Sequence, residues 1–253
     1  MDIGAVKDAA FEFDRELLAR KRKLSPATFD WYPHSTMGNA HHLDALLTGE
    51  QRTVMADIAG SAVADVGGAD GDWSFFLEQH LGCQVDLIDN EEYNCNHLRG
   101  ARCMKQDLGS DVAIHSLDLD SQFALPRNHY GAVFFLGTLY HLKNPYYVME
   151  ALAKRAELCF VSTRIAQLTP DHRTRIDEVP VAYLLHSSEA NNDSTNYWIF
   201  SKAALLRLFA RTGWDVLDFM TVGCTEGSDP ASPDRDERAF ALLRSRVAAE
   251  RAR

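Results

Sequence analysis

No run of about eighteen apolar residues occurs in this chain of 253 residues, so no segment is suited to span a membrane as a helix. The N-terminus also lacks the basic region and apolar core of a secretory signal, and carries acidic residues such as Asp2 and Asp8 instead. Low-complexity tracts and repeats of fixed period are absent as well. These absences predict a folded cytoplasmic protein that has no contact with a membrane.

The cysteines form no C-x-x-C pair and show no zinc-ligand spacing. They are Cys83, Cys95, Cys103, Cys159 and Cys224. An odd number of thiols without such pairs favours a reducing compartment. The histidines His34, His41 and His42 lie close together, but no carboxylate stands at ligand spacing, so we expect no metal site.

Basic residues are too few to balance the acidic ones, and the 26 lysines and arginines against 36 aspartates and glutamates give a net charge of −10. Such a balance repels phosphate backbones on average and disfavours nucleic acid as a partner, without excluding tRNA. The one dense basic cluster, Arg20–Lys23, follows an amphipathic stretch. We interpret it as the solvated end of a helix, because basic residues favour helix C-termini.

From about Ser61 onward, short apolar runs alternate with segments of helical length, a pattern typical of successive βα units around a mostly parallel sheet. The predicted strands are Ala62–Val66, Gln84–Ile88, Val112–Leu117, Ala132–Leu136 and Leu158–Ser162. The predicted helices between them are Trp73–His80, Tyr93–Leu98 and Pro145–Arg155. A helix over 201–212 should stop at Gly213, and the runs WDVLDFMTV and RAFALLRSR predict a closing antiparallel hairpin, although the tail can also be read as a helix.

Residues 1–60 have helical character, with the best candidates at Phe11–Lys23 and His41–Leu47. Between them lies the aromatic and polar segment FDWYPHSTMGNAHH, which begins at Phe29. We expect residues 1–60 to form a helical extension that acts as a lid over the mouth of a site in a domain formed by residues 61–253.

The strongest signal is VADVGGADGDW at 63–73, in which Asp65 ends a predicted strand and a glycine-rich turn leads into a helix. Gly67 and Gly71 allow backbone angles and a close ligand approach that a side chain would prevent. Backbone N–H groups at such a turn can hold a carboxylate or a phosphate. Nicotinamide and flavin sites have G-x-G-x-x-G, which this run does not match.

Acidic residues also end the next two predicted strands. Asp89 in QVDLID can accept hydrogen bonds from both hydroxyls of a ribose, although it could instead cap a helix or form a turn. In SLDLD, Asp118 is placed to receive an adenine amino group, with Asp120 as the alternative and Leu119 as an apolar contact. Either aspartate could instead face solvent in a loop.

The D-x-G-x-x-x-G arrangement of Asp65, Gly67 and Gly71 resembles motif I of the class I methyltransferases that use S-adenosylmethionine (SAM), with Ala69 where that family usually has a glycine. The segment FFLGTLYHLKNPYYVMEAL at 134–152 resembles the L-x-x-L-Y-H-x-x-x-P region of one branch. That branch includes the tRNA wobble-uridine carboxymethyltransferases and many small-molecule methyltransferases. The resemblance covers roughly residues 61–152.

This resemblance implies a Rossmann-like α/β fold with a mostly parallel seven-stranded sheet and an antiparallel C-terminal hairpin. It also implies SAM as the cofactor, held by 61–253. The residues expected to bind SAM are Asp65, Gly67, Gly68, Gly71, Trp73, Asp89, Asn90, Asp118, Leu119 and Leu136.

Tyr140 and His141 directly follow a predicted strand, at the edge where open α/β sheets bind ligands, and are the candidate catalytic residues. His141 could act as a general base, because its ordinary pKa is close to the working pH, or could simply hold a loop. Tyr140 is expected to contact the cofactor or the substrate.

Residues outside these motifs complete the predicted acceptor pocket. The candidate substrate-binding residues are Tyr32, His34, Asn39, Arg164, Tyr197 and Trp198. The first three could instead cap the lid, Arg164 could form a surface salt bridge, and the two aromatic residues could belong to the core.

The sequence therefore predicts an enzyme that transfers a methyl group from SAM to an O or N atom of a small metabolite, and it is compatible with a homodimer. Two alternatives remain open, a tRNA-modifying methyl- or carboxymethyltransferase and a non-catalytic SAM-binding subunit, for which Ala69 is the one hint. A nicotinamide oxidoreductase is a third alternative, disfavoured by the glycine spacing.

Overall fold

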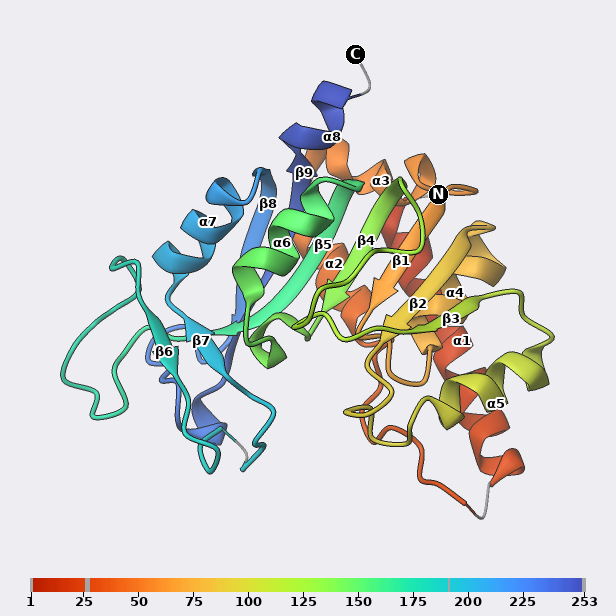
Figure 1. Ribbon diagram of the computed structural model, residues 1–253, viewed down its shortest axis with the longest axis horizontal. Coiled ribbons are helices and arrows are strands. Elements are labelled where there is room, and N and C mark those ends of the chain that lie inside the picture. Colours follow the sequence, from red (N-terminus) through yellow and green to blue (C-terminus); the bar gives the residue numbers. More distant parts are fainter. Residues whose placement is uncertain (1, 26–27, 191, 252–253) are drawn as a thin grey trace. The chain divides into compact units, whose positions relative to one another are not determined.

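The computed structural model describes residues 2–25, 28–190 and 192–251 (Figure 1). The chain divides between Phe134 and Phe135 into two compact units. Within the described residues, no helix is both long and apolar enough to cross a membrane. Helices alternate with mostly parallel strands in the first unit and an antiparallel hairpin closes the second, which confirms the predicted α/β class.

The first unit contains a parallel sheet in the order β3-β2-β1-β4. Its strands are β1 (Ala62–Val66), β2 (Gln84–Asp89), β3 (Ala113–Ser116) and β4 (Tyr130–Leu136). The carboxyl ends of these strands lie at one edge, so the turns that follow β1, β2 and β3 lie near one another. β1 and β2 are buried except near their ends, which explains their short continuous apolar runs.

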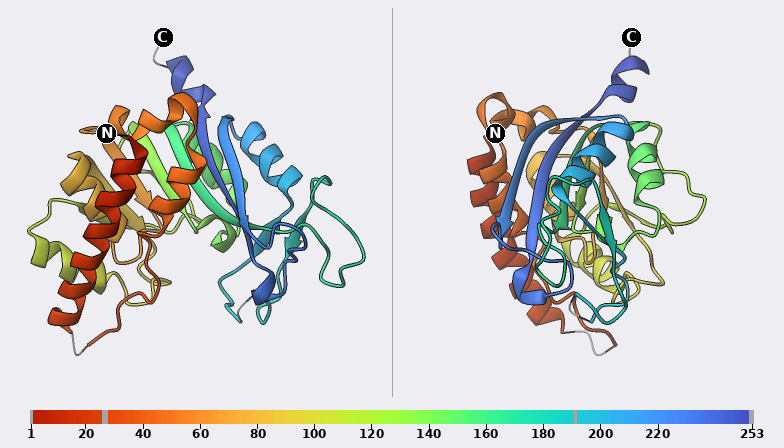
Figure 2. Two further views of the ribbon diagram at one scale, coloured as in Figure 1. Left: turned by 180° about the vertical axis from the view of Figure 1, so that it is seen from behind. Right: turned by 90° about the vertical axis from the view of Figure 1, so that its left-hand side faces the viewer.

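The helices of this unit include the predicted N-terminal extension. They are α1 (Ile3–Leu24), α2 (Asn39–Leu46), the 3-10 helix η1 (Gly49–Thr53), α3 (Val54–Asp57), α4 (Asp72–Leu81) and α5 (Arg99–Leu108). Figure 2 shows α1 running alongside α2. Buried positions on α1 recur every three or four residues, and Phe13 packs against Phe76 of α4 with ring centroids 5.9 Å apart.

One position of the basic cluster Arg20–Lys23 differs from the sequence interpretation. Lys21 continues the buried stripe of α1, is only 8% exposed, and forms an ion pair with Asp72 at 2.8 Å. The interpretation as a solvated helix end is therefore wrong for Lys21, although Arg22 and Lys23 are exposed. Helical periodicity, not charge, decides which residue of the cluster is buried.

The predicted helix at Tyr93–Leu98 is also wrong, because the helix in this region starts at Arg99. The side-chain oxygen of Asn94 accepts hydrogen bonds from the backbone N–H groups of Asn96 and Leu98, at 3.1 and 3.0 Å. His97 and Leu98 have positive φ angles of 56° and 57°. A local side-chain bond of this kind competes with helix formation and delays the helix start.

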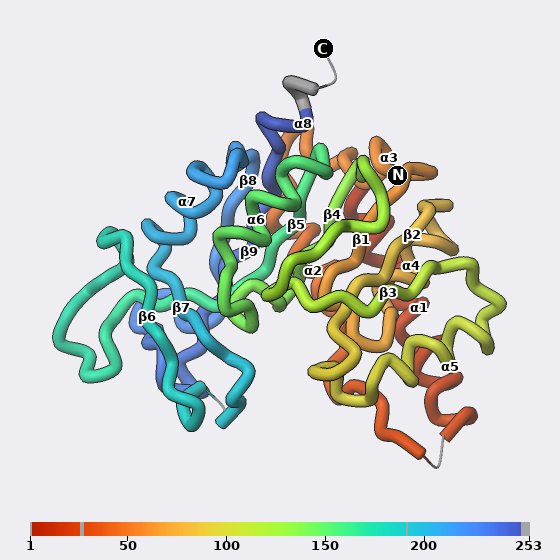
Figure 3. Tube along the Cα trace, viewed as in Figure 1, coloured from red at the N-terminus to blue at the C-terminus, as the bar shows by residue number. Residues whose placement is uncertain are grey.

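The second unit is organised around β5, which pairs antiparallel with β9, and β9 pairs antiparallel with β8. Its strands are β5 (Ala156–Ile165), β6 (Ala182–Leu184), β7 (Trp198–Phe200), β8 (Trp214–Gly223) and β9 (Glu237–Ser245). The predicted closing hairpin is confirmed, and Figure 3 shows its two strands side by side. The short strands β6 and β7 were not predicted.

Helices precede and follow these strands. They are the 3-10 helices η2 (Leu139–His141) and η3 (Pro233–Arg235), and the α-helices α6 (Pro145–Ala153), α7 (Lys202–Arg211) and α8 (Arg246–Arg251). α7 ends two residues before Gly213, whose φ is 94°, as predicted. Both readings of the C-terminal region hold in part, because β9 is followed by α8.

The side chain of Trp214 fixes the start of β8 against α6. It is 1% exposed, and its indole N–H donates to the Met149 carbonyl at 3.0 Å. We expect Trp214→Ala to lower the free energy of unfolding in urea by about 3–5 kcal/mol, because it leaves a large cavity. Val216→Ala is the control on the same strand, 37% exposed, and should cost about 0.5 kcal/mol or less. Equal costs would contradict this packing.

Candidate functional site

The glycine-rich turn joins β1 to α4 at the carboxyl edge of the first unit's sheet. Gly67 and Gly71 have φ angles of 76° and 83°, which favour glycine. A Cβ atom at Gly68 would lie 2.8 Å from Oδ2 of Asp65, and one at Gly71 would lie 2.8 Å from the Leu87 side chain. The backbone therefore approaches its neighbours more closely than any side chain allows.

Ala69 stands where the resembling family usually has a glycine, and its φ of 51° is left-handed. An alanine in this conformation costs about 1–2 kcal/mol. The Ala69 N–H donates to Oδ2 of Asp89 at 3.0 Å, which helps to hold the turn. The turn thus keeps a shape suited to glycine despite the substitution.

Asp65 is buried beneath the turn and accepts a hydrogen bond from the Ser74 hydroxyl at 2.7 Å. Burial raises the pKa of Asp65 to about 7, although the Ser74 hydrogen bond opposes this shift. Asp65 therefore ties β1 to the first turns of α4 and contributes to the shape of the turn from below.

The structure brings Asp89, at the end of β2, against this turn. Its carboxylate accepts hydrogen bonds from the Asn90 N–H at 2.7 Å and from the Asn94 side chain at 3.1 Å, besides the Ala69 N–H. Burial raises the pKa of Asp89, and the hydrogen bonds from Asn94, Asn90 and Ala69 oppose this shift. A carboxylate held by several donors has a fixed orientation at the edge of the sheet.

The remaining predicted cofactor residues of the first unit lie around the same edge. Asp118 follows β3, is exposed, and accepts a hydrogen bond from the Asp120 N–H at 3.0 Å, while Leu119 beside it is buried. Asn90 accepts a hydrogen bond from the Glu92 N–H at 3.0 Å. Asp118 and Asn90 thus both shape the turns that follow β3 and β2.

Trp73 lies in the core of the first unit, with its ring centroid 5.3 Å from that of Phe76 and 5.5 Å from that of Phe134. The predicted contact of Trp73 with the cofactor therefore depends on its backbone N–H, which lies in the first turn of α4.

Asp70, which the sequence analysis passed over, joins three separate segments at the turn. Its carboxylate accepts hydrogen bonds from the Tyr32 N–H at 2.8 Å and from the Asn96 side chain at 2.7 Å, and Lys21 lies 3.5 Å away. Its place inside the glycine motif was a signal that could have found it.

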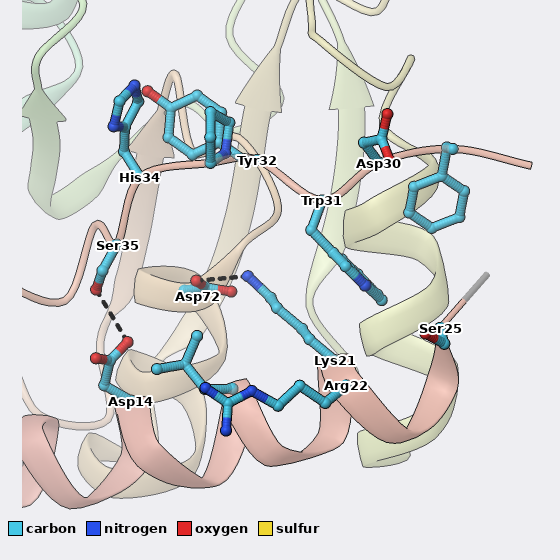
Figure 4. A pocket seen from close by; sticks show the side chains of 13 residues that line it. Asp14, Lys21, Arg22, Ser25, Asp30, Trp31, Tyr32, His34, Ser35 and Asp72 are labelled. Carbon is cyan, nitrogen blue, oxygen red and sulfur yellow. Dashed lines mark hydrogen bonds and ion pairs between the residues drawn. The ribbon is translucent and has the colours of Figure 1, made fainter. Parts of the chain in front are cut away.

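A cavity of about 360 Å³ lies between α1 and the segment 29–35, with Tyr32 and His34 in its lining (Figure 4). The rings of these two residues meet edge to face, with centroids 5.4 Å apart. Asn39 does not line this cavity. It begins α2 and donates its side-chain N–H to the Thr36 carbonyl at 2.9 Å. The structure thus groups two of the three predicted substrate residues of this region.

In the second unit, His141 lies in η2 with Nδ1 3.0 Å from the Thr195 hydroxyl oxygen and 3.1 Å from the Thr195 carbonyl. The Thr195 hydroxyl donates its proton to Asp193 at 2.7 Å, so both Thr195 oxygens act as acceptors toward His141. Nδ1 therefore carries the proton, and Nε2 has the free lone pair. Burial lowers the pKa of His141, which favours the neutral ring.

Tyr140 is nearly buried and contacts Arg238 of β9, a residue that the sequence analysis did not consider. Nη1 of Arg238 donates to the Tyr140 hydroxyl at 3.5 Å, and the guanidinium carbon lies 5.7 Å from the ring centroid. Arg238 also pairs with Asp236 at 3.2 Å. The phenol thus lies next to a fixed positive charge.

The structure also places the predicted substrate residues of the second unit. Arg164 is 2% exposed and forms an ion pair with Asp236, whose side chain is 33% exposed, so the guanidinium is buried and its partner reaches solvent. The Tyr197 N–H donates to the Tyr140 carbonyl at 2.8 Å. Trp198 donates its indole N–H to the Lys143 carbonyl at 3.3 Å.

Leu136 is half-buried at the end of β4. Among the residues that the structure describes, no three His, Cys, Asp or Glu side chains are grouped as metal ligands.

No family model and no curated protein sequence matches this chain. Several solved structures are similar. The N-terminal domain of EvdMO1, crystallised in the presence of S-adenosylhomocysteine (SAH) and D-fucose, matches with a TM-score of 0.60 at 16% identity, over 92% of this chain and 97% of that one. The chain has a Rossmann-like methyltransferase fold.

Two further structures support this fold. The [4+2]-cyclase SpnF matches with a TM-score of 0.56 at 13% identity, over 96% of this chain and 97% of that one. A candidate methyltransferase of Bacillus halodurans, BH2331, matches with a TM-score of 0.55 at 13% identity, over 76% of this chain and 96% of that one. Open sheets of the Rossmann-like kind bind ligands at the carboxyl ends of their strands, where the glycine turn and Asp89 lie.

The raised pKa of Asp65 predicts how stability depends on pH. The folded state retains a proton that the unfolded chain releases near pH 4, so this stabilisation is complete below about pH 4 and is lost as the pH rises through about 7. Relative to Asp65→Asn, the wild type should lose on the order of 3 kcal/mol of unfolding free energy between pH 5 and 8.

Urea unfolding at several pH values measures this difference, and Asp57→Asn at an exposed position of α3 serves as the control. If the unfolding free energies of the wild type and Asp65→Asn changed with pH in parallel, the pKa of Asp65 would not be raised and the prediction would be contradicted.

Proposed function

We propose that this protein is a SAM-dependent methyltransferase that methylates an O or N atom of a small molecule. The observation that carries the proposal is the glycine turn with the carboxylate of Asp89 fixed against it through the Ala69 N–H. The turn leaves no room for side chains at positions 68 and 71, because it packs tightly on Asp65, Leu87 and Phe75, and this packing fixes the backbone of the turn.

The residues fit SAM in three places. Asp89 is suited to accept hydrogen bonds from the ribose hydroxyls, because a carboxylate can serve two donors at once. The turn 67–71 and the first turn of α4 offer N–H groups to the carboxylate of the methionine part. Asp118 and Leu119 are the candidate contacts to the adenosine, and Leu136 at the end of β4 stays a predicted cofactor contact.

When bound, SAM supplies a methyl group on a positively charged sulfur. The protein then has to orient an acceptor and remove its proton. His141 is suited to the second task, because Thr195 holds its Nδ1 proton and leaves Nε2 as a base. Tyr140, Arg164, Tyr197 and Trp198 are the candidate acceptor contacts of the second unit, and Tyr32, His34 and Asn39 those of the first.

Similar proteins support a small-molecule acceptor. Two structures that match nearly end to end are the N-terminal domain of EvdMO1, crystallised with a sugar present, and SpnF, a [4+2]-cyclase. The net charge of −10 also disfavours tRNA. SpnF has a similar fold and is a [4+2]-cyclase, so the fold alone does not determine methyl transfer. A non-catalytic SAM-binding subunit is the second candidate function.

Calorimetry with SAM and SAH tests the cofactor. Micromolar binding by the wild type should weaken by about ten- to a hundredfold in Asp89→Ala, because hydrogen bonds to a charged group are worth about 1.5–3 kcal/mol. Asp111→Ala at an exposed position should bind as the wild type does. If the wild type bound neither SAM nor SAH, the proposed function would be contradicted and only the fold assignment would remain.

Turnover over a panel of small-molecule acceptors and tRNA, followed by SAH release, tests the reaction. Turnover of tRNA with a steep salt dependence would favour the tRNA-modifying alternative. SAM binding without turnover of any acceptor would favour the non-catalytic alternative.

Once an acceptor has been identified, the variant His141→Gln tests whether His141 is the general base. We expect kcat/KM to fall by about 10²- to 10⁴-fold with SAM affinity unchanged. Because burial lowers the pKa of His141, the wild-type kcat/KM should be constant at neutral pH and fall only below its ordinary pKa near 6.5. A small effect on kcat/KM with an unchanged pH profile would assign His141 a structural role.

A further inference from the structure

A buried lysine lies beside the glycine turn and has no role in the proposed chemistry. Nζ of Lys21, on α1, is 2.8 Å from Oδ2 of Asp72 and 3.5 Å from Oδ2 of Asp70. It also lies 5.5 Å from the ring centroid of Trp31. A buried ammonium is stable only with such partners, so its position is set by the two carboxylates.

The two carboxylates flank Gly71, one before it in the turn and one after it in the first turn of α4. Oδ1 of Asp72 is buried and has no hydrogen-bond partner within the described part of the chain. Burial raises the pKa of Asp72, and Lys21 opposes this shift. Without Lys21, two negative charges would remain buried two residues apart, and their repulsion would act directly on the turn.

Asp70 cannot move aside to relieve this repulsion. A Cβ atom added at Gly100 would lie 2.1 Å from its Oδ1, so α5 packs directly against the carboxylate. Asn96 donates to Oδ1 and also to the Asp30 carbonyl at 3.2 Å, which joins the turn to segment 29–35. Lys21 and its two partners, Asp70 and Asp72, therefore connect α1, segment 29–35 and the turn. Figure 4 shows the ion pair of Lys21 with Asp72 beside this segment.

We propose that Lys21 is a positioning residue for the cofactor: by neutralising Asp70 and Asp72 it holds the turn 67–71 in the conformation that binds SAM. The inference rests on the proposed function of that turn. The N–H groups that would meet the methionine carboxylate belong to the backbone that carries these aspartates, so a displaced Asp70 or Asp72 also displaces them. In this proposal Lys21 acts on the turn through Asp70 and Asp72, and it also lines the cavity that contains Tyr32 and His34.

The test compares SAM affinity with thermal stability in matched variants. Lys21→Met removes the charge and Lys21→Arg keeps it, while Lys23→Met removes an exposed charge two positions along the same helix. Phe13→Leu is the control for destabilisation alone, because it weakens the packing of α1 on α4 without changing a charge. SAM binding is measured by calorimetry well below the melting temperature of every variant.

We expect Lys21→Met to weaken SAM binding about tenfold or more, which corresponds to about 1.4 kcal/mol. Lys21→Arg should recover most of the affinity, and Lys23→Met and Phe13→Leu should bind as the wild type does. A lower melting temperature of Lys21→Met with unchanged SAM affinity, as for Phe13→Leu, would overturn the inference and leave Lys21 a structural role.

Two further results need their own interpretation: a variant that does not fold, and a wild type that does not bind SAM. If Lys21→Met does not fold, Lys21→Gln removes the charge but keeps a hydrogen-bond donor for Asp72, and it should fold and bind SAM about tenfold more weakly, because the repulsion between the two carboxylates remains. Wild-type affinity in Lys21→Gln would overturn the inference. Failure of the wild type to bind SAM would overturn the proposed function, whereas equal binding by wild type and Lys21→Met would overturn this inference alone.

Discussion

The first unit depends on keeping carboxylates buried around one turn. Asp65, Asp70 and Asp72 belong to the segment that joins β1 to α4, and Asp89 reaches the same turn from β2. Each of these carboxyl groups is stabilised differently. Asp65 accepts a hydrogen bond from a hydroxyl and has a pKa raised to about 7, the half-buried Asp89 is held by backbone and amide donors, and the other two are paired with Lys21. These compensating groups come from α1, α4 and the loops after β2, so the electrostatics of the turn also determine how those segments pack.

Most of the fold could be predicted from the sequence because it is encoded locally. Short apolar runs gave β1 with its observed bounds and the other parallel strands within a few residues, and the hairpin of β8 and β9 follows from two such runs around a loop. The failures have physical causes. Asn94 bonds to the backbone ahead of it and delays α5 to Arg99, an effect that periodicity does not register. The three-residue strands β6 and β7 are too short to produce a pattern.

The candidate site also contains residues that could be predicted from the sequence and residues that could not. The glycine turn and Asp89 were predictable because strand ends and glycine spacing are visible in the sequence, and the structure brings them together. The sequence analysis interpreted Lys21 from its charge as exposed, although its position on the apolar stripe of α1 was the better indication that it is buried. Arg238 could not be found, because it meets Tyr140 across 98 residues and its strand reads only as an apolar run. The acceptor of the His141 Nδ1 proton is also distant in sequence, since Thr195 lies 54 residues from His141 in a region without regular periodicity.

A crystal structure grown with saturating SAH tests the central claim most directly, because it locates the nucleoside relative to the turn. The account predicts the ribose hydroxyls within hydrogen-bond distance of the Asp89 carboxylate, and the amino-acid end of SAH against the backbone of residues 67–71. SAH bound elsewhere on the chain, or a ribose held by other groups while Asp89 keeps only its present partners, would contradict it.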